Sequence, residues 1–490
     1  MLARRLTSAR GATAALCVLV GWSACSRHPA TVGDGHFAEQ KAPKDAGGTD
    51  REWDLAVRAR VAGDALMNAG KLGDARKAFE EALALTTRLV DAEPHSFERW
   101  WELAGSYSKL GDVLVRQGRL DDARIVYRDV LSIFRRVAGA DPGNAEKQRD
   151  LSVCYERIGD VLMAEGKLGE AHASFVEATA IRQHLAETDP GNADKQRDLS
   201  VGHNRIGDVL MREGRLEDAR RAYEDAMRIA QRRLNTEPGN PGKQRDLSVC
   251  YERLGDALMA GSKLSEAHAS FTQASAIRRR LAEADPGNTS TQRDLAVSYN
   301  KLGDVLVKEG DLAAARKAYE EDLAIAKRLA DAGDPNNVIN QRDLAISYER
   351  LGSVLERAGD LTAARKAYES ALVVANKLPV ADADKQRDLF VANAKLGGVL
   401  LSDGNPEWAH RVFDAALQSA LYLADADPSN ADKARDLVVA YSRVGQAALA
   451  AGNPAAARQA YEDGLRNVSR LPGPDSVAMQ QWFQVELARR

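Results

Sequence analysis

Cysteine and histidine are the residues of this 490-residue chain whose chemistry is most easily recognised. Cys154 and Cys250 could form a disulfide bond, and His172, His268 and His410 could bind a metal ion. Their spacing is that of a repeat and not of a metal site. The sequence contains no H-E-x-x-H, C-x-x-C, phosphate-loop or G-x-S-x-G motif. We therefore expect no catalytic residue, no metal site and no cofactor.

These residues occupy equivalent positions of an internal repeat, which a leucine marks at the start of each copy. From Leu103 to Leu295 this marker leucine recurs at a step of 48 residues. The full series is Leu55, Leu103, Leu151, Leu199, Leu247, Leu295, Leu344, Leu389 and Leu437. Glycine follows eight residues after each marker, alanine twenty residues after it, and Phe or Tyr twenty-four residues after it. Nine copies in one register indicate a repeat architecture.

Each copy is predicted to form two helices. The first helix places apolar residues on one face of a 3.6-residue period, as in Leu151, Tyr155, Ile158 and Leu162. Gly166 ends it, and the second helix continues the pattern with Leu168, Ala171, Phe175, Ala178 and Leu185. A turn such as Asp-Pro-Gly-Asn at 189–192 separates successive copies, with Asn192 placed to cap the next helix. We expect Gly159 and Ala171 to lie where the two helices cross.

The spacing of glycine, alanine, aromatic residue and proline resembles the tetratricopeptide repeat. Ile158-Gly159 stands for the L-G of that pattern, and Ala171 and Phe175 stand for its A-x3-F. The copies are longer than usual. In the copy that contains Gly159, an additional QRDL turn precedes the usual start and the closing Pro190 comes late. The resemblance covers residues 51–474. It implies an all-α solenoid of nine helix-turn-helix repeats in a superhelix, and it does not specify the function.

The geometry of the repeat argues against a disulfide between Cys154 and Cys250. Helices pack about 8–10 Å apart, so positions two repeats apart lie on the order of 20 Å from each other. A disulfide needs Cα atoms within about 7 Å. Other copies hold small residues at this position, among them Ser106, Gly202 and Ser298. We expect both cysteines to pack as small buried side chains.

The N-terminus has a different character from the repeats. Arg4, Arg5 and Arg10 precede an apolar run at 12–22, which is the length of a signal-peptide core. The run ends in Trp-Ser-Ala-Cys at 22–25, which resembles a bacterial lipobox with Trp22 in place of the usual aliphatic residue. We expect a lipoprotein-type signal peptide at 1–24, lipidation of Cys25 and a flexible tether at 25–50. The alternatives are plain secretion into the periplasm and a retained cytoplasmic segment.

Two series of side chains recur on the first helices, which line the concave groove in the family that the chain resembles. The second residue after the marker is Val or Ile in most copies, and we favour burial against the neighbouring repeat over a role in lining the groove. The sixth residue is Lys or Arg, and Asp follows three residues later in copies two to six. We expect these to form solvated pairs within one helix.

The acidic residue is missing from the last three copies, where Arg350, Lys395 and Arg443 remain. Unpaired cations would create a positive potential that attracts an acidic segment of a partner. The alternative is sequence drift at the less regular end of the array. Chaperone-binding members of the family hold a terminal carboxylate with lysine and asparagine at two groove positions. Glu156 and Asp160 stand at those positions here, so we do not expect a clamp of that kind.

The last residues, 475–490, are predicted to form a capping helix. Val477, Met479, Trp482, Phe483 and Val485 provide apolar surface that could cover the end of the solenoid. Val485 lies 48 residues after Leu437, where a tenth copy would begin.

Composition limits the function further. The formal net charge of −3 gives no electrostatic reason to expect a nucleic-acid partner. We expect a non-enzymatic protein-protein interaction scaffold that binds unidentified proteins or peptide segments and is held at a bacterial cell envelope, at the outer membrane or on the periplasmic side, by its lipid. The alternative is a regulatory or sensing module that recruits its partners through the repeat groove.

Overall fold

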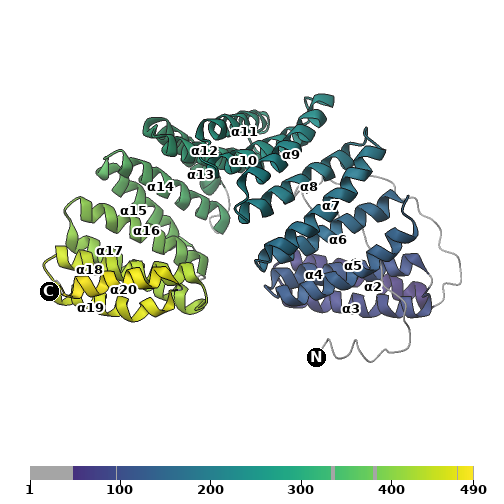
Figure 1. Cartoon of the computed structure of the whole chain (residues 1–490), viewed down its shortest axis with the longest axis horizontal. Helices are drawn as coiled ribbons and strands as arrows, with labels where there is room; N and C mark the ends of the chain where they lie inside the picture. Colours follow the sequence, from purple (N-terminus) through teal and green to yellow (C-terminus); the bar gives the residue numbers. More distant parts are fainter. Residues whose placement is uncertain (1–47, 95, 333–336, 379–382, 472, 489–490) are drawn as a thin grey trace. The chain divides into compact units, whose positions relative to one another are not determined.

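The computed structural model describes residues 48–94, 96–332, 337–378, 383–471 and 473–488. These ranges form nineteen α-helices and one short 3₁₀ helix, arranged in consecutive helix-turn-helix pairs, which confirms the all-α solenoid (Figure 1). The chain divides into two compact units, Met1–Ala257 and Leu258–Arg490. Cys25, residues 1–24 and most of the predicted tether lie outside the described residues.

Unit 1 contains four consecutive helix pairs, which are followed by α10. Its helices are α2 (Gly48–Asn68), α3 (Leu72–Ala92), α4 (Phe97–Arg116), α5 (Leu120–Ala140), α6 (Ala145–Ala164), α7 (Leu168–Thr188), α8 (Ala193–Arg212), α9 (Leu216–Thr236) and α10 (Pro241–Ala260). The boundary between the units lies near the C-terminal end of α10. Each helix packs against the next one in the chain, from α2 to α9.

Unit 2 continues the same arrangement and ends in an additional helix. Its helices are α11 (Leu264–Ala284), α12 (Thr289–Glu309), α13 (Leu312–Ala332), α14 (Val338–Arg357), α15 (Leu361–Lys377), α16 (Ala383–Ser402), α17 (Pro406–Ala426), α18 (Ala431–Ala450), α19 (Pro454–Asn467), η1 (Val468–Arg470) and α20 (Pro474–Ala488). Each α-helix from α11 to α19 packs against its successor, and α20 packs against α19.

The glycine eight residues after each marker leucine lets the two helices of a pair approach closely. In α6, a Cβ added to Gly159 would lie 2.6 Å from Cε1 of Phe175 in α7, which is closer than carbon atoms pack. The same relationship joins Gly111 to Tyr127 and Gly397 to Phe413. The predicted crossing is therefore confirmed. The aromatic side chain, buried against the glycine, is what makes the glycine necessary.

The KQRDL segment at 147–151 connects its copy to the preceding one. Asn144 caps α6 by accepting a hydrogen bond from the backbone N–H of Lys147, and the Lys147 ammonium pairs with Asp141 at 2.8 Å. The Gln148 side chain donates to the Ala138 carbonyl at the end of α5, at 3.0 Å. This carbonyl belongs to the last turn of a helix, where backbone acceptors lack partners within the helix. The additional turn thus closes the junction between copies.

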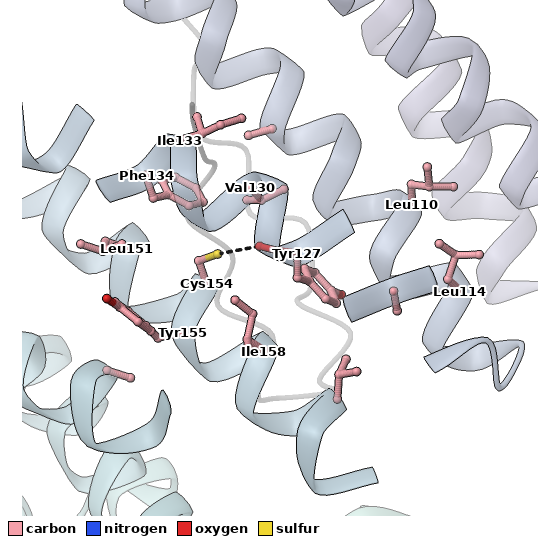
Figure 2. Close-up of a cluster of buried hydrophobic side chains, with 14 of the residues drawn as sticks. Leu110, Leu114, Tyr127, Val130, Ile133, Phe134, Leu151, Cys154, Tyr155 and Ile158 are labelled. Atoms are coloured by element: carbon pink, nitrogen blue, oxygen red, sulfur yellow. Dashed lines mark hydrogen bonds between the residues drawn. The ribbon is translucent and has the colours of Figure 1, made fainter. Parts of the chain in front are cut away.

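The predicted packing of the cysteines is confirmed, because both side chains are buried and neither forms a disulfide. Figure 2 shows Cys154 in the apolar core between α5 and α6, where it lies beside Phe134 and its Sγ approaches the Tyr127 carbonyl at 3.8 Å. Within the described ranges, none of the helices combines the length and the apolar character that crossing a membrane requires.

The last helix covers the apolar end of α18 and α19. Phe483 of α20 is fully buried, and its ring lies 6.2 Å from that of Tyr461 in α19. Trp482 meets Tyr461 edge to face at 5.5 Å. Val477 and Val485, in contrast, are exposed, so Val485 does not take the buried position of a tenth marker leucine. The aromatic pair of α20 provides the contact.

Candidate functional site

Charged side chains on the first helices form ion pairs between successive copies. The arginine of QRDL in one copy reaches the aspartate of QRDL in the next copy. In unit 1, Arg149 pairs with Asp198 at 2.6 Å, and in unit 2 Arg342 pairs with Asp388 at 2.8 Å. At these junctions the QRDL turn therefore contributes an ion pair in addition to its hydrogen bond.

A second series of ion pairs joins the basic residue six positions after one marker to the aspartate nine positions after the preceding marker. Lys109 contacts Asp64 at 2.6 Å, and Arg157 contacts Asp112 at 3.4 Å. In unit 2, Arg350 pairs with Asp304. The prediction that these charges pair within one helix is wrong, because each cation extends back to the helix of the preceding copy.

The aspartate of this series also accepts a hydrogen bond from the aromatic residue of its own copy. The Tyr319 hydroxyl donates to Asp304 at 2.7 Å, and the Tyr127 hydroxyl donates to Asp112 at 2.6 Å. In copies two, four and six, where the aromatic residue is a tyrosine, the tyrosine, the aspartate and the cation of the following copy form one partly buried network. Burial, reinforced by the nearby carboxylate, raises the pKa of Tyr319 well above its usual range, so the hydroxyl stays a donor.

Because each cation pairs with the preceding copy, the cations that lack an aspartate at the C-terminal end differ from those that the sequence predicted. Arg350, predicted to be unpaired, has Asp304. Lys395 would pair with residue 353, which is Ser353, and Arg443 would pair with residue 398, which is Gly398. Both Lys395 and Arg443 are exposed on their helices. Arg443 donates to Gln446 of its own helix at 3.4 Å.

A pocket of about 580 Å³ lies where the first missing aspartate leaves the network open. We call it the α14–α16 pocket. Its walls come from α14 and α16, with Asp304 and Val307 of α12 at one side and Ala371 and Ala375 of α15 at its base. Arg350 and Lys395 both line it, whereas Arg443 of α18 is not among its lining residues.

The α14–α16 pocket has an excess of basic side chains. Five basic residues line it, against the three acidic residues Asp304, Glu349 and Asp388. Two of the five, Arg342 and Arg350, are held by Asp388 and Asp304. Within the ranges that the structure describes, no ion pair engages the other three, which are Arg357, Arg387 and Lys395.

Glu349 is the acidic side chain that faces this group. Burial raises the pKa of its carboxyl, and the charge of Lys395 acts in the opposite direction. Arg387 similarly lowers the pKa of Asp436 on α18, against a larger effect of burial. Neither carboxylate is within ion-pair distance of a pocket cation, so the positive side chains remain accessible to an external anion.

The apolar lining of the pocket corrects a second expectation. Ile346 and Val391, two positions after their markers, line the pocket, and Ile346 is exposed. Val297 and Val439 at the same position in other copies are also exposed. This series is therefore not buried against the neighbouring repeat, and here it provides apolar surface beside the cations.

Unit 1 contains a smaller pocket of about 220 Å³ on α2, α4 and α6. Its base includes Phe134, which stands at the position equivalent to Ala375 and takes up space that the α14–α16 pocket leaves open. Its three basic residues are all ion-paired, Arg60 with Glu102 at 2.6 Å, Lys109 with Asp64 and Arg157 with Asp112. The two pockets thus differ in both volume and available charge.

Sequence reasoning missed Arg357 and Arg387, which stand outside the series that pointed to Lys395. They matter because they line the pocket, and the pocket exists because Ala371 and Ala375 of α15 are small. That pair of small residues is the feature of the sequence that could have indicated the pocket. Among the described residues, no group of three or more His, Cys, Asp or Glu side chains is placed to hold a metal ion.

Comparison with known families identifies the repeat. Models of the tetratricopeptide repeat match residues 103–142, 204–241, 295–336 and 345–376. These four segments of the chain match tetratricopeptide repeats. Such repeats are typically non-catalytic protein-interaction scaffolds. A comparison with curated protein sequences finds no match.

Several solved structures are similar to this chain. The apo form of RapI is 11% identical, with a TM-score of 0.50, over 84% of this chain and 97% of RapI. BtubC from P. vanneervenii is 21% identical, with a TM-score of 0.42, over 52% of this chain and 90% of BtubC. A STAND protein with a tetratricopeptide repeat sensor, PH0952 from Pyrococcus horikoshii, is 13% identical, with a TM-score of 0.46, over 79% of this chain and 52% of that chain.

Proposed function

We propose that this protein is a non-enzymatic scaffold that recruits a partner protein to a bacterial cell envelope, where a lipid on Cys25 anchors it. The observation that carries the recruiting role is the α14–α16 pocket, which combines apolar walls with three basic side chains that form no ion pair within the described residues. Binding surfaces of proteins typically join apolar contact area to a few oriented polar groups. The α14–α16 pocket, which departs from the regular repeat, is suited to holding a segment of another chain.

The anchoring role is supported by the sequence around Cys25. The apolar run at 12–22 is too short to span a bilayer comfortably, and the residues that follow Cys25 offer little apolar surface of their own. Membrane attachment would therefore depend on the lipid. Intact mass of the membrane-extracted protein tests this directly: a diacylated chain that begins at Cys25 is expected, and an unmodified chain that begins at Met1 would contradict it.

Fractionation of a Cys25→Ala variant provides the functional test. The variant should leave the membrane fraction while its melting temperature stays unchanged, because Cys25 lies outside the repeats. Affinity capture from solubilised envelope should then recover the same partner with the wild type and with this variant. If capture is lost together with the lipid, recruitment depends on the anchor, and the proposed role of the pocket is contradicted.

A further inference from the structure

We propose that the α14–α16 pocket binds an acidic peptide segment that carries an aliphatic side chain. This inference rests on the proposed function, because it names the chemistry of the partner that the scaffold would hold. The carboxylates of the segment would pair with Arg357, Arg387 and Lys395, and its aliphatic group would contact Ile346 and Val391.

The positive charge of the pocket results from the residue nine positions after the marker leucine, which is Asp304 in one copy and Ser353 in the next. In the preceding junction, Asp304 accepts from the Tyr319 hydroxyl and pairs with Arg350. In the next junction, Ser353 stands in the place of that aspartate and its hydroxyl lies 3.0 Å from that of Tyr368. The Tyr368 hydroxyl donates to Glu356 at 2.8 Å, and the serine beside it carries no charge. Lys395, the cation that an aspartate would have held, is left facing the pocket.

The space in the pocket has a similar origin. The position of Ala375 holds Phe134 in α5 and Arg182 in α7, and Arg182 pairs with Glu156 across the same face. Ala375 has no side chain that could reach Glu349, the residue equivalent to Glu156. The absence of a large side chain leaves both the volume and an apolar base, so the pocket accepts an aliphatic group as well as carboxylates.

The preference for an acidic segment follows from the sum of these contacts. Five cations against three carboxylates attract anions, while the three carboxylates repel a long continuous polyanion that would lie across them. A nucleic acid presents regularly spaced phosphates and no aliphatic group to occupy the base. A short segment with separated carboxylates around a Leu or Val fits both features.

The test uses labelled nonapeptides and the full chain in detergent, with fluorescence anisotropy as the readout. A peptide of alternating Glu and Leu should bind, and its affinity should fall as the salt concentration rises. A Glu–Ser peptide should bind more weakly, and a Lys–Leu peptide should not bind. Equal binding of the Lys–Leu peptide, or tighter binding of a single-stranded oligonucleotide, would overturn the proposal.

Ser353→Asp is the decisive variant, because it restores the aspartate that the other junctions contain and that Tyr368 is placed to contact. The affinity for the Glu–Leu peptide should fall by about tenfold, since Lys395 becomes paired. Gln446→Asp adds the same charge at the equivalent position of α18, outside the pocket, and should leave the affinity unchanged. Equal effects of the two variants would overturn the proposal.

A further variant keeps the test decisive if Ser353→Asp does not fold. Lys395→Ala removes an exposed side chain, so the fold should be retained and the same peptide should bind more weakly. If envelope proteins are captured through the pocket but their segments are not acidic, this inference fails while the scaffold function stands. If nothing is captured and the Glu–Leu peptide still binds as expected, the scaffold function fails instead.

Discussion

Arg350 pairs with Asp304, which lies 46 residues earlier in the chain, and not with a residue of its own helix. The charged residues of each first helix thus connect one repeat to the preceding one. A solenoid depends on such nearest-neighbour contacts, since each repeat touches only the repeats on either side. The same contact explains why the loss of one aspartate changes the charge of a position one repeat further along.

Asp304→Asn should separate the structural effect of this contact from its effect on binding. The variant leaves Arg350 without its carboxylate, so the free energy of unfolding should fall by about 1–3 kcal/mol. The freed guanidinium should also increase the affinity of the α14–α16 pocket for the Glu–Leu peptide. Urea denaturation and anisotropy measure the two effects. A variant that binds the peptide more weakly would contradict the electrostatic account.

Gly159→Ala tests the close packing of the helix pair. The added methyl group would overlap the Phe175 ring, and the free energy of unfolding should fall by about 1–3 kcal/mol or more. Gly169→Ala is the matched control, because nothing lies within 4 Å of its Cβ position in the first turn of α7. The control should be neutral or stabilising by up to about 1 kcal/mol. Equal destabilisation of both variants in urea would refute the steric explanation.

Asp150 gives the stability of unit 1 a defined pH dependence. The arginine that pairs with this aspartate in other copies is replaced by Trp101, and Asp150 is 1% exposed with neither carboxylate oxygen hydrogen-bonded. Burial, with a smaller contribution from Glu146, raises its pKa from 3.8 to about 7. The folded state therefore favours the protonated carboxyl, and its stability is fully present below pH 4 and falls as the pH rises to about 7.

An Asp150→Asn variant cannot ionise, so it should avoid this loss. Its stability relative to the wild type should increase between pH 4 and pH 8, by up to about 4 kcal/mol if the whole shift is expressed. Asp198→Asn, at the same position of the next copy, removes the partner of Arg149 and should be destabilising at pH 8. Thermal melts across this range give the answer, and a difference between Asp150→Asn and wild type that does not vary with pH would contradict it.

Phe483→Ala tests the capping role of α20. The side chain is fully buried against Gly464 and Tyr461, so its loss should lower the free energy of unfolding of unit 2 by about 3–5 kcal/mol. Val485→Ala alters an exposed residue of the same helix and should have little effect. Deletion of residues 475–490 should reproduce the loss and cause aggregation. A melt and a size-exclusion profile that both stay unchanged would refute the cap.

The fold could be predicted from sequence because the same residue pattern occurs in every copy of the repeat. One occurrence of Gly159 before Ala171 and Phe175 would be ambiguous, but the same spacing in nine copies defines two helices and their crossing. The buried cysteines followed from the same register. Val485 has the spacing of a tenth marker but is exposed, whereas Phe483 of the same helix is buried and fits against Gly464.

The site was only partly predictable, since its chemistry depends on contacts between copies. Lys395 could be found from the missing aspartates, but the sequence does not show whether a cation reaches three residues along its helix or back to the preceding repeat. Arg350 reaches back to the preceding repeat and is therefore paired with Asp304. Arg387 belongs to the QRDL series and Arg357 does not belong to the series that contains Lys395, and the space above Ala371 and Ala375 brings the three together.

Site-specific photo-crosslinking in the organism that encodes this protein tests the central claim most directly. A photoreactive residue replaces Ile346 inside the α14–α16 pocket or Val373, a 53% exposed residue of α15 that does not line it. The account predicts an adduct with a defined protein at Ile346 and none at Val373, and it predicts that Ser353→Asp weakens the adduct. The absence of an adduct at Ile346, or equal adducts at both positions, would contradict it.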